Sequence, residues 1–254
     1  MAPMTSIVRL PRHEWGPPDA TRHALLVHGL GSNGALMWRF GVALAEAGWC
    51  ATAVDLRGHG TAPRALDYTL EAYGVDVAAT RPRGGGPWDL VLGHSLGGAA
   101  VTLAASRHPD WARRLVLVDP GLRLTDEQRA TVRAGQEEAF AAGDAAAVRA
   151  RNPHWHENDV ELKALSTRQV SRWAVEQTAE QNPGWDVSTF ARDLAVPTHV
   201  IGADPDVWSI FTGALADEVC ANPMVSMSVV AGAGHSPQRD RPDETMRQFF
   251  AAIG

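Results

Sequence analysis

Short apolar runs alternate with longer stretches of mixed polarity along most of the chain. The apolar runs are three to six residues long and lie near residues 24–27, 51–54, 90–92, 115–118, 198–201 and 225–230. Runs of this length, separated by helical segments, are typical of a parallel sheet with helices on both faces. We therefore expect an α/β fold with a mostly parallel central sheet. An edge hairpin is expected near residues 7–10.

One stretch interrupts this alternation. Residues 122–192 contain no strand pattern, and helical segments are expected over about 126–142 and 160–181. Beyond them, Met246, Phe249, Phe250 and Ile253 follow helical spacing and predict a closing helix that packs on the sheet.

Composition narrows the range of functions. The 254 residues carry a formal net charge of −6, so there is no basic footprint for a nucleic acid or an anionic membrane surface. No apolar run has the length of a secretory signal or of a membrane span, about 20 residues for the latter, and we expect a cytoplasmic protein without a membrane partner. No His, Cys and carboxylate cluster has metal-ligand spacing, so no metal is expected.

The most informative motif is Gly93-His94-Ser95-Leu96-Gly97, between a predicted strand and an alanine-rich apolar segment. Such a strand–turn–helix lifts a serine hydroxyl above the sheet edge, and only small residues fit two positions before and after the serine. The first amides of the following helix favour negative charge nearby. Ser95 is therefore the expected nucleophile.

A base and an acid are expected after later strands. His235 follows the last predicted strand through a glycine-rich turn, and a neutral imidazole is suited to take the serine proton. Asp204, just after the preceding strand, is the first choice for the acid that orients the imidazole. Asp206 in the same loop and Asp119 at the end of an earlier strand stay open as alternatives. The order Ser, Asp, His along the chain is the one found in proteins with this strand–turn–helix at the nucleophile.

Two backbone amides are expected to form an oxyanion hole. One belongs to Leu96, directly after the nucleophile, and the other to Leu30 in the glycine-rich loop that ends an early strand. Removal of one comparable donor costs about 3 to 4 kcal/mol of transition-state stabilisation.

Together with Asp55-Leu56-Arg57-Gly58-His59-Gly60, these motifs resemble α/β-hydrolase-fold serine hydrolases of the capped esterase and lipase-like branch. The resemblance implies a core domain of residues 1–121 and 193–254, with a helical cap, residues 122–192, inserted after the sixth strand. A cap shapes the substrate pocket. Its three tryptophans are therefore candidates for substrate binding, although they can equally hold the cap in place: Trp155, Trp173 and Trp185.

The resemblance further implies a cofactor-free hydrolase of carboxylic esters or lactones, which acts through an acyl-enzyme on Ser95. The expected substrate is a small apolar ester or lactone. Three alternatives stay open: a carbon–carbon bond hydrolase, an acyltransferase or perhydrolase with the same triad, and a non-catalytic ligand-binding protein of this fold. The oligomeric state is open as well.

Overall fold

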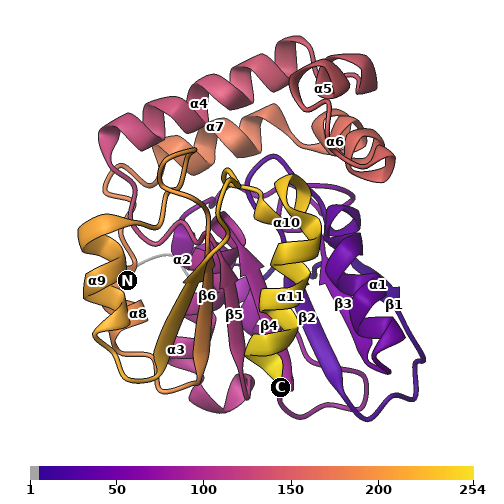
Figure 1. The fold of residues 1–254 in the computed structure, drawn as a ribbon, viewed down its shortest axis with the longest axis vertical. Helices are drawn as coiled ribbons and strands as arrows, with labels where there is room; N and C mark the ends of the chain where they lie inside the picture. The colour runs from indigo at the N-terminus through magenta and orange to yellow at the C-terminus, as the bar shows by residue number, and fades with distance from the viewer. Residues whose placement is uncertain (1–5) are drawn as a thin grey trace.

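A seven-stranded sheet forms the centre of the molecule, in a computed structural model that describes residues 6–254 (Figure 1). The strands are β1 (Arg12–Trp15), β2 (His23–Val27), β3 (Cys50–Val54), β4 (Leu90–His94), β5 (Leu115–Val118), β6 (Thr198–Gly202) and β7 (Val225–Val229). Their spatial order is β1-β3-β2-β4-β5-β6-β7, and only β1 runs antiparallel to its neighbour. The predicted mostly parallel α/β sheet is therefore confirmed.

The prediction of an edge hairpin near residues 7–10 is wrong. The edge strand is β1, which pairs with β3 rather than with the next strand in the chain. Residues 7–10 instead cover the core: Leu10 is buried in it, and the amide of Val8 donates to Asp76 Oδ1 at 2.7 Å.

Helices cover both faces of the sheet. In chain order, the helices of the described residues are α1 (Trp38–Glu46), α2 (Leu70–Ala78), α3 (Leu96–Arg107), α4 (Asp126–Ala141), α5 (Ala145–Arg151), α6 (Glu157–Gln169), α7 (Arg172–Glu180), α8 (Ser188–Arg192), α9 (Gly213–Cys220), α10 (Pro237–Asp240) and α11 (Pro242–Ile253), with two 3-10 helices, η1 (Gly34–Met37) and η2 (Pro109–Trp111). Two separate apolar clusters result, one under α2, α3 and α9 and one under α1 and α11. The central strands β3, β4 and β5 are buried along their whole length because both of their faces are covered.

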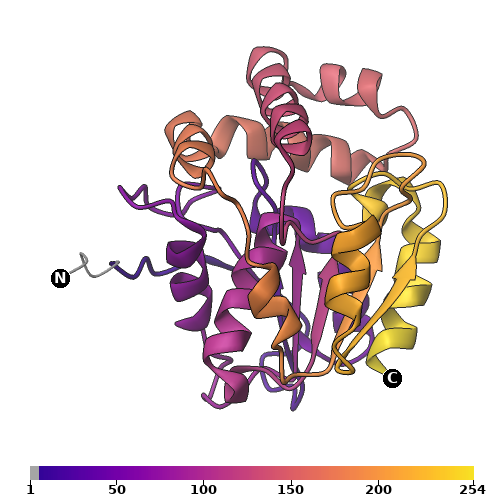
Figure 2. The same cartoon turned by 90° about the vertical axis from the view of Figure 1, so that its left-hand side faces the viewer.

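The predicted helical stretch comprises α4 to α8, between β5 and β6. Five strands of the described chain precede it, so it follows the fifth strand rather than the sixth. Figures 1 and 2 show α4 to α7 above the carboxyl ends of the parallel strands. Helix α4 begins with a capping box between Thr125 and Gln128, which fixes where the chain turns into this layer. Among residues 6–254, none of the helices is both long and apolar enough to cross a membrane.

Candidate active site

Ser95 occupies a sharp turn between β4 and α3. Its φ and ψ angles are 54° and −119°, a conformation that residues other than glycine rarely adopt. The neighbouring glycines make this turn possible. A Cβ atom on Gly97 would lie 2.3 Å from the carbonyl oxygen of Val27, and one on Gly93 would lie 2.6 Å from that of Gly97.

The side chain of Ser95 lies beside a histidine. His235 Nε2 is 2.9 Å from Ser95 Oγ, and His235 Nδ1 is 2.6 Å from Asp119 Oδ2. A carboxylate only accepts hydrogen bonds, so we assign the ring proton to Nδ1, which leaves Nε2 free to accept the serine hydroxyl. A continuous hydrogen-bond chain thus joins Asp119, His235 and Ser95.

Register explains why Asp119 reaches this position. His94 and Val118 are paired residues in the parallel strands β4 and β5, and Ser95 and Asp119 are the residues that follow them. Both side chains therefore emerge at the carboxyl edge of the sheet, one strand apart. Asp119 has a positive φ of 35°, which turns the chain away from the sheet at this point.

The carboxylate of Asp119 is fully buried but well supplied with donors. Its Oδ1 accepts from the hydroxyl of Ser209 at 2.6 Å and its Oδ2 from the amide of Ile210 at 3.2 Å. Burial by itself would raise the pKa of Asp119, but the hydrogen bond and charge of His235, together with these donors, hold its pKa below the usual value. Asp119 is therefore an anion next to the imidazole.

The expectation that Asp204 pairs with His235 is not met. Asp204 accepts hydrogen bonds from the backbone amides of Gly232 at 2.7 Å and Asp206 at 2.9 Å, which lower its pKa. These bonds tie the loop after β6 to the loop after β7. Asp204 lies in the predicted loop, but its oxygens are used to shape that loop, and Asp206 is exposed at the surface.

The loop after β2 passes close to the nucleophile. A Cβ atom on Gly29 would lie 2.9 Å from Ser95 Cβ, so only a glycine allows this approach. Leu30 follows at the cavity wall, and Leu96 opens α3, where a helix leaves its first amides without an intrahelical acceptor. The two amides expected for an oxyanion hole thus belong to segments that meet at Ser95.

Comparison with known proteins shows the family to which the chain belongs. The sequence model described as "Alpha/beta hydrolase family" matches residues 24–248. The chain belongs to the alpha/beta hydrolase family.

Curated relatives of this hydrolase include several esterases. The pimeloyl-[acyl-carrier protein] methyl ester esterase of Neisseria meningitidis serogroup C is 40% identical over 118 residues, which span 46% of this chain and 44% of that protein. The 2-(acetamidomethylene)succinate hydrolase of Mesorhizobium japonicum is 28% identical over 246 residues, 88% of this chain and 84% of that protein.

Solved structures show the same fold. A crystal structure of E-2-(acetamidomethylene)succinate hydrolase superposes with a TM-score of 0.82 at 24% identity, covering 97% of this chain and 95% of that one. An esterase from Exiguobacterium antarcticum superposes with a TM-score of 0.78 at 15% identity, covering 97% and 96%.

A cavity of about 350 Å³ opens above Ser95 in this hydrolase. The core supplies Leu30, Trp208 and His235 to its walls, and α4 to α6 with their connections supply others: Thr131, Val132, Gln136, Val148, Arg151, Trp155 and Lys163. The helical stretch between β5 and β6 therefore forms part of the candidate substrate site.

The three candidate tryptophans have different positions. Trp155 lines the cavity, and its Nε1 donates to Asp240 Oδ1 at 2.7 Å. Trp173 does not line it and is 49% exposed on α7. Trp185 is buried in the main core, where Nε1 donates to the carbonyl oxygen of Gly121 at 2.7 Å. Only Trp155 is thus placed to contact a substrate.

Several cavity residues escaped the sequence prediction. The ring of Trp208 meets that of His235 edge-on at 5.1 Å, and Lys163 Nζ donates to the carbonyl oxygen of Gly31 at 2.8 Å. Arg239 lies four residues after His235, and Lys163 is the only lysine in the sequence. Both facts are visible in the sequence, but neither shows that the residue faces the cavity.

His94 contacts the backbone of His235. Its Nε2 is 2.8 Å from the carbonyl oxygen of His235, and the two rings are 4.9 Å apart. Burial, with the nearby charges of His235 and Arg239, lowers the pKa of His94 to about 3. It is therefore neutral and holds the turn that carries His235.

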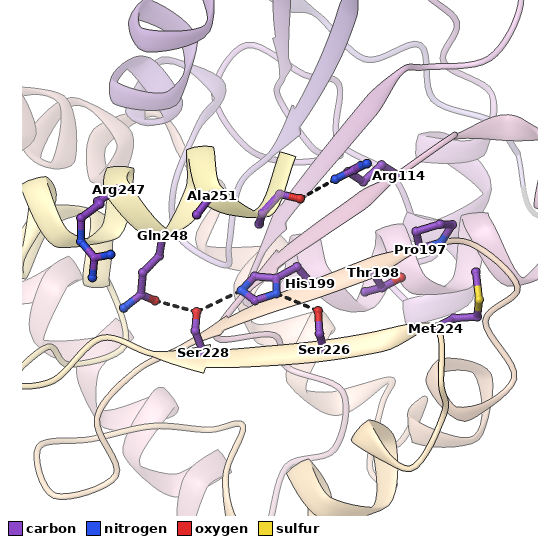
Figure 3. Close-up of a pocket in the computed structure, with 11 residues that line it drawn as sticks. Arg114, Pro197, Thr198, His199, Met224, Ser226, Ser228, Arg247, Gln248 and Ala251 are labelled. Carbon is purple, nitrogen blue, oxygen red and sulfur yellow. Dashed lines mark hydrogen bonds between the residues drawn. The ribbon is translucent and has the colours of Figure 1, made fainter. Parts of the chain in front are cut away.

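A second hollow of about 410 Å³ lies between β6, β7 and α11 and does not include Ser95 (Figure 3). Its polar groups bond to one another: His199 lies 2.9 Å from Ser226 Oγ and 3.0 Å from Ser228 Oγ, and Ser228 Oγ donates to Gln248 Oε1 at 2.7 Å. This hollow is larger than the cavity above Ser95, but its histidine and serine side chains are hydrogen-bonded to one another and to Gln248. Within residues 6–254, no group of three or more His, Cys, Asp or Glu side chains is placed to hold a metal ion.

Proposed function

We propose that this protein is a cofactor-free serine hydrolase that cleaves carboxylic esters or lactones through an acyl-enzyme on Ser95. The observation that carries the proposal is the hydrogen-bond chain from Asp119 through His235 to Ser95 Oγ. A serine hydroxyl is a weak nucleophile at neutral pH, and a neutral imidazole at hydrogen-bond distance is the group that activates it.

In the acylation half-reaction, Ser95 Oγ attacks the carbonyl carbon while its proton moves to His235 Nε2. Asp119 stays ionised and stabilises the imidazolium. The amides of Leu30 and Leu96 donate to the oxyanion of the tetrahedral intermediate. When the intermediate collapses, the ester carbon–oxygen bond breaks and His235 gives its proton to the leaving alcohol.

In the deacylation half-reaction, water takes the place of the alcohol. His235 accepts a proton from the water as the water oxygen attacks the acyl carbon. His235 then returns a proton to Ser95 Oγ as the carboxylic acid product leaves. The free serine and neutral histidine are restored, so no further reactant is needed.

We assign a cap role to residues 122–192, over a core of residues 1–121 and 193–254. Helices α4, α5 and α6 supply walls of the cavity above Ser95, and this placement supports the assignment. A cap of this kind excludes water and selects the substrate.

The relatives support the ester class of substrate. The Neisseria protein is named as a methyl ester esterase, although its match spans less than half of either chain. The ester specificity is therefore an inference from the site together with that name.

The test is hydrolysis of a panel of methyl esters, aryl esters and one lactone by the wild type, Ser95→Ala and the control Ser106→Ala. Ser95→Ala should lower kcat at least 10³-fold with an unchanged melting temperature, because a triad member is lost without a packing change. Ser106→Ala, at the end of α3, should stay within twofold of the wild type. A wild type that hydrolyses none of the panel would contradict the proposed substrate class.

A further inference from the structure

Three cationic side chains line the cavity above Ser95. They come from three separate helices: Arg239 from α10, Lys163 from α6 and Arg151 from α5. No aspartate or glutamate is among the described residues that form the cavity wall. The space next to the nucleophile is therefore positively charged, in a chain whose net charge is −6.

Arg239 is buried, and its guanidinium has no hydrogen-bonding partner among residues 6–254. The residue is 6% exposed, its guanidinium donates to no residue within 6–254, and its Nε is enclosed without an acceptor. The guanidinium carbon lies 5.2 Å from the ring centroid of Trp155, so the group packs over this wall of the cavity. Burial of a charge that lacks hydrogen bonds costs folding free energy. This arrangement is therefore typical of a group that binds an anionic ligand.

Two acidic residues lie near Arg239, but their oxygens are bonded elsewhere. Asp159 accepts from Trp38 Nε1 at 2.9 Å and from Arg39 Nη2 at 2.6 Å. Asp240 accepts from Trp155 Nε1 and from the amide of Gly234 at 2.9 Å. These carboxylates moderate the positive potential, and they leave the guanidinium donors of Arg239 free.

Lys163 and Arg151 add to the positive charge of the same space. Burial, followed by the charges of Arg239 and Arg151, lowers the pKa of Lys163 to about 7. Arg151 is partly neutralised, since its Nη1 lies 3.1 Å from Glu138 Oε1. Lys163 is therefore only partly protonated near neutral pH, and an anion in the cavity would favour its charged form and reduce the repulsion among the three side chains.

We propose that the substrate of Ser95 carries a second, free carboxylate and that Arg239 binds it. The inference rests on the proposed hydrolytic function and specifies its substrate class as half-esters of short dicarboxylic acids. A guanidinium can donate two parallel hydrogen bonds to a carboxylate, which fixes the far end of the substrate while the ester carbonyl faces Ser95. The apolar walls at Val132, Val148 and Trp155 then contact the methylene chain, so the expected apolar pocket has a cationic end.

The kinetic test compares monomethyl adipate with methyl hexanoate, which have the same chain length and differ in the terminal carboxylate. The wild type should prefer monomethyl adipate at least tenfold in kcat/KM. Arg239→Gln should reduce this preference to within threefold of unity, and Arg239→Lys should restore part of it because the charge returns without the planar fork. The control Arg247→Gln, on the exposed face of α11, should keep the wild-type preference.

Two kinetic outcomes would overturn the inference. One is a wild type without a preference for the charged ester. The other is a folded Arg239→Gln protein that keeps the wild-type preference, because the carboxylate would then be recognised elsewhere.

A binding experiment separates this inference from the proposed function. The Ser95→Ala protein is titrated in a calorimeter with adipate and with 1,6-hexanediol, a charged and a neutral probe of equal length. This measurement of binding does not require turnover. Adipate should bind at least tenfold more tightly, and Arg239→Gln should remove the difference. Equal binding of both probes would overturn the carboxylate subsite. A wild type that binds adipate but hydrolyses no ester would support the subsite and contradict only the proposed function.

Discussion

His235 Nδ1 and Asp119 Oδ2 are 2.6 Å apart, although the two residues are 116 positions apart in the sequence. The contact makes Asp119 the candidate acid, and this residue follows β5, the neighbour of the strand β4 that leads into Ser95. The carboxylate in the loop after β6, Asp204, bonds instead to two backbone amides.

Exchange of the two acids for their amides tests this assignment. Asp119→Asn should lower kcat by about 10² to 10⁴, because an amide favours the wrong histidine tautomer and no longer stabilises imidazolium. Asp204→Asn should stay within about threefold of the wild-type kcat. Ester hydrolysis by both variants at saturating substrate gives the comparison. A larger loss of kcat in Asp204→Asn than in Asp119→Asn would show that Asp204, in the loop after β6, is the acid.

Gly97→Ala tests the backbone of the nucleophile turn. The new Cβ would meet the carbonyl oxygens of Val27 and His28 at 2.3 and 2.6 Å, and backbone atoms cannot easily move away. We expect urea denaturation to show a loss of about 1 to 3 kcal/mol in the free energy of unfolding. The matched control is Gly135→Ala in α4, where nothing lies within 4 Å and a gain of about 0.5 to 1 kcal/mol is expected. Equal effects of the two changes would show that the turn is not under this steric constraint.

Substitution of each of the three tryptophans in residues 122–192 should have a different effect. Trp185→Ala should lower the free energy of unfolding by about 3 to 5 kcal/mol, because a large buried side chain leaves a cavity. Trp173→Ala, at an exposed site, should change it by about 0.5 kcal/mol or less. Trp155→Ala should alter the substrate profile of kcat/KM, since this side chain lines the cavity. A profile unchanged by Trp155→Ala, but altered by Trp173→Ala, would contradict the placement of the site.

Lys163 predicts a specific pH dependence of stability. Its pKa is about 7 in the folded protein, well below the 10.5 of an ordinary lysine, so the unfolded chain binds more protons between these values. The free energy of unfolding should therefore rise with pH from 7 to 9. Lys163→Met should show a smaller slope in urea denaturation over this range. Identical slopes would mean that Lys163 has an ordinary pKa in the folded state.

The sequence was sufficient for the parts of the site that depend on local patterns. In three places a predicted strand is followed by small residues: at the turn of Ser95, at the glycine loop before Leu30 and before His235. A short stretch of sequence is enough to predict each of these motifs. The acid was ambiguous because Asp119 and Asp204 both follow strands. Only the pairing of His94 with Val118 shows that Asp119 follows the strand next to Ser95.

The cavity wall could not be predicted in the same way. Which side chains of α4 to α6 face Ser95 depends on how the helices pack above the sheet, and helical spacing alone does not fix that direction. Arg239 looks in the sequence like any other arginine. Its significance comes from burial without a partner, which is a property of the packed structure.

Reaction with a fluorophosphonate, followed by mass analysis of the intact protein and of its peptides, tests directly whether Ser95 is the nucleophile. We expect one phosphonyl group per molecule, on the peptide that contains Ser95, with ester hydrolysis lost in proportion to labelling. His235→Ala should slow the labelling by several powers of ten, because the serine loses its base. Full loss of activity with the label on another residue, or unchanged hydrolysis after Ser95 is fully modified, would contradict the account.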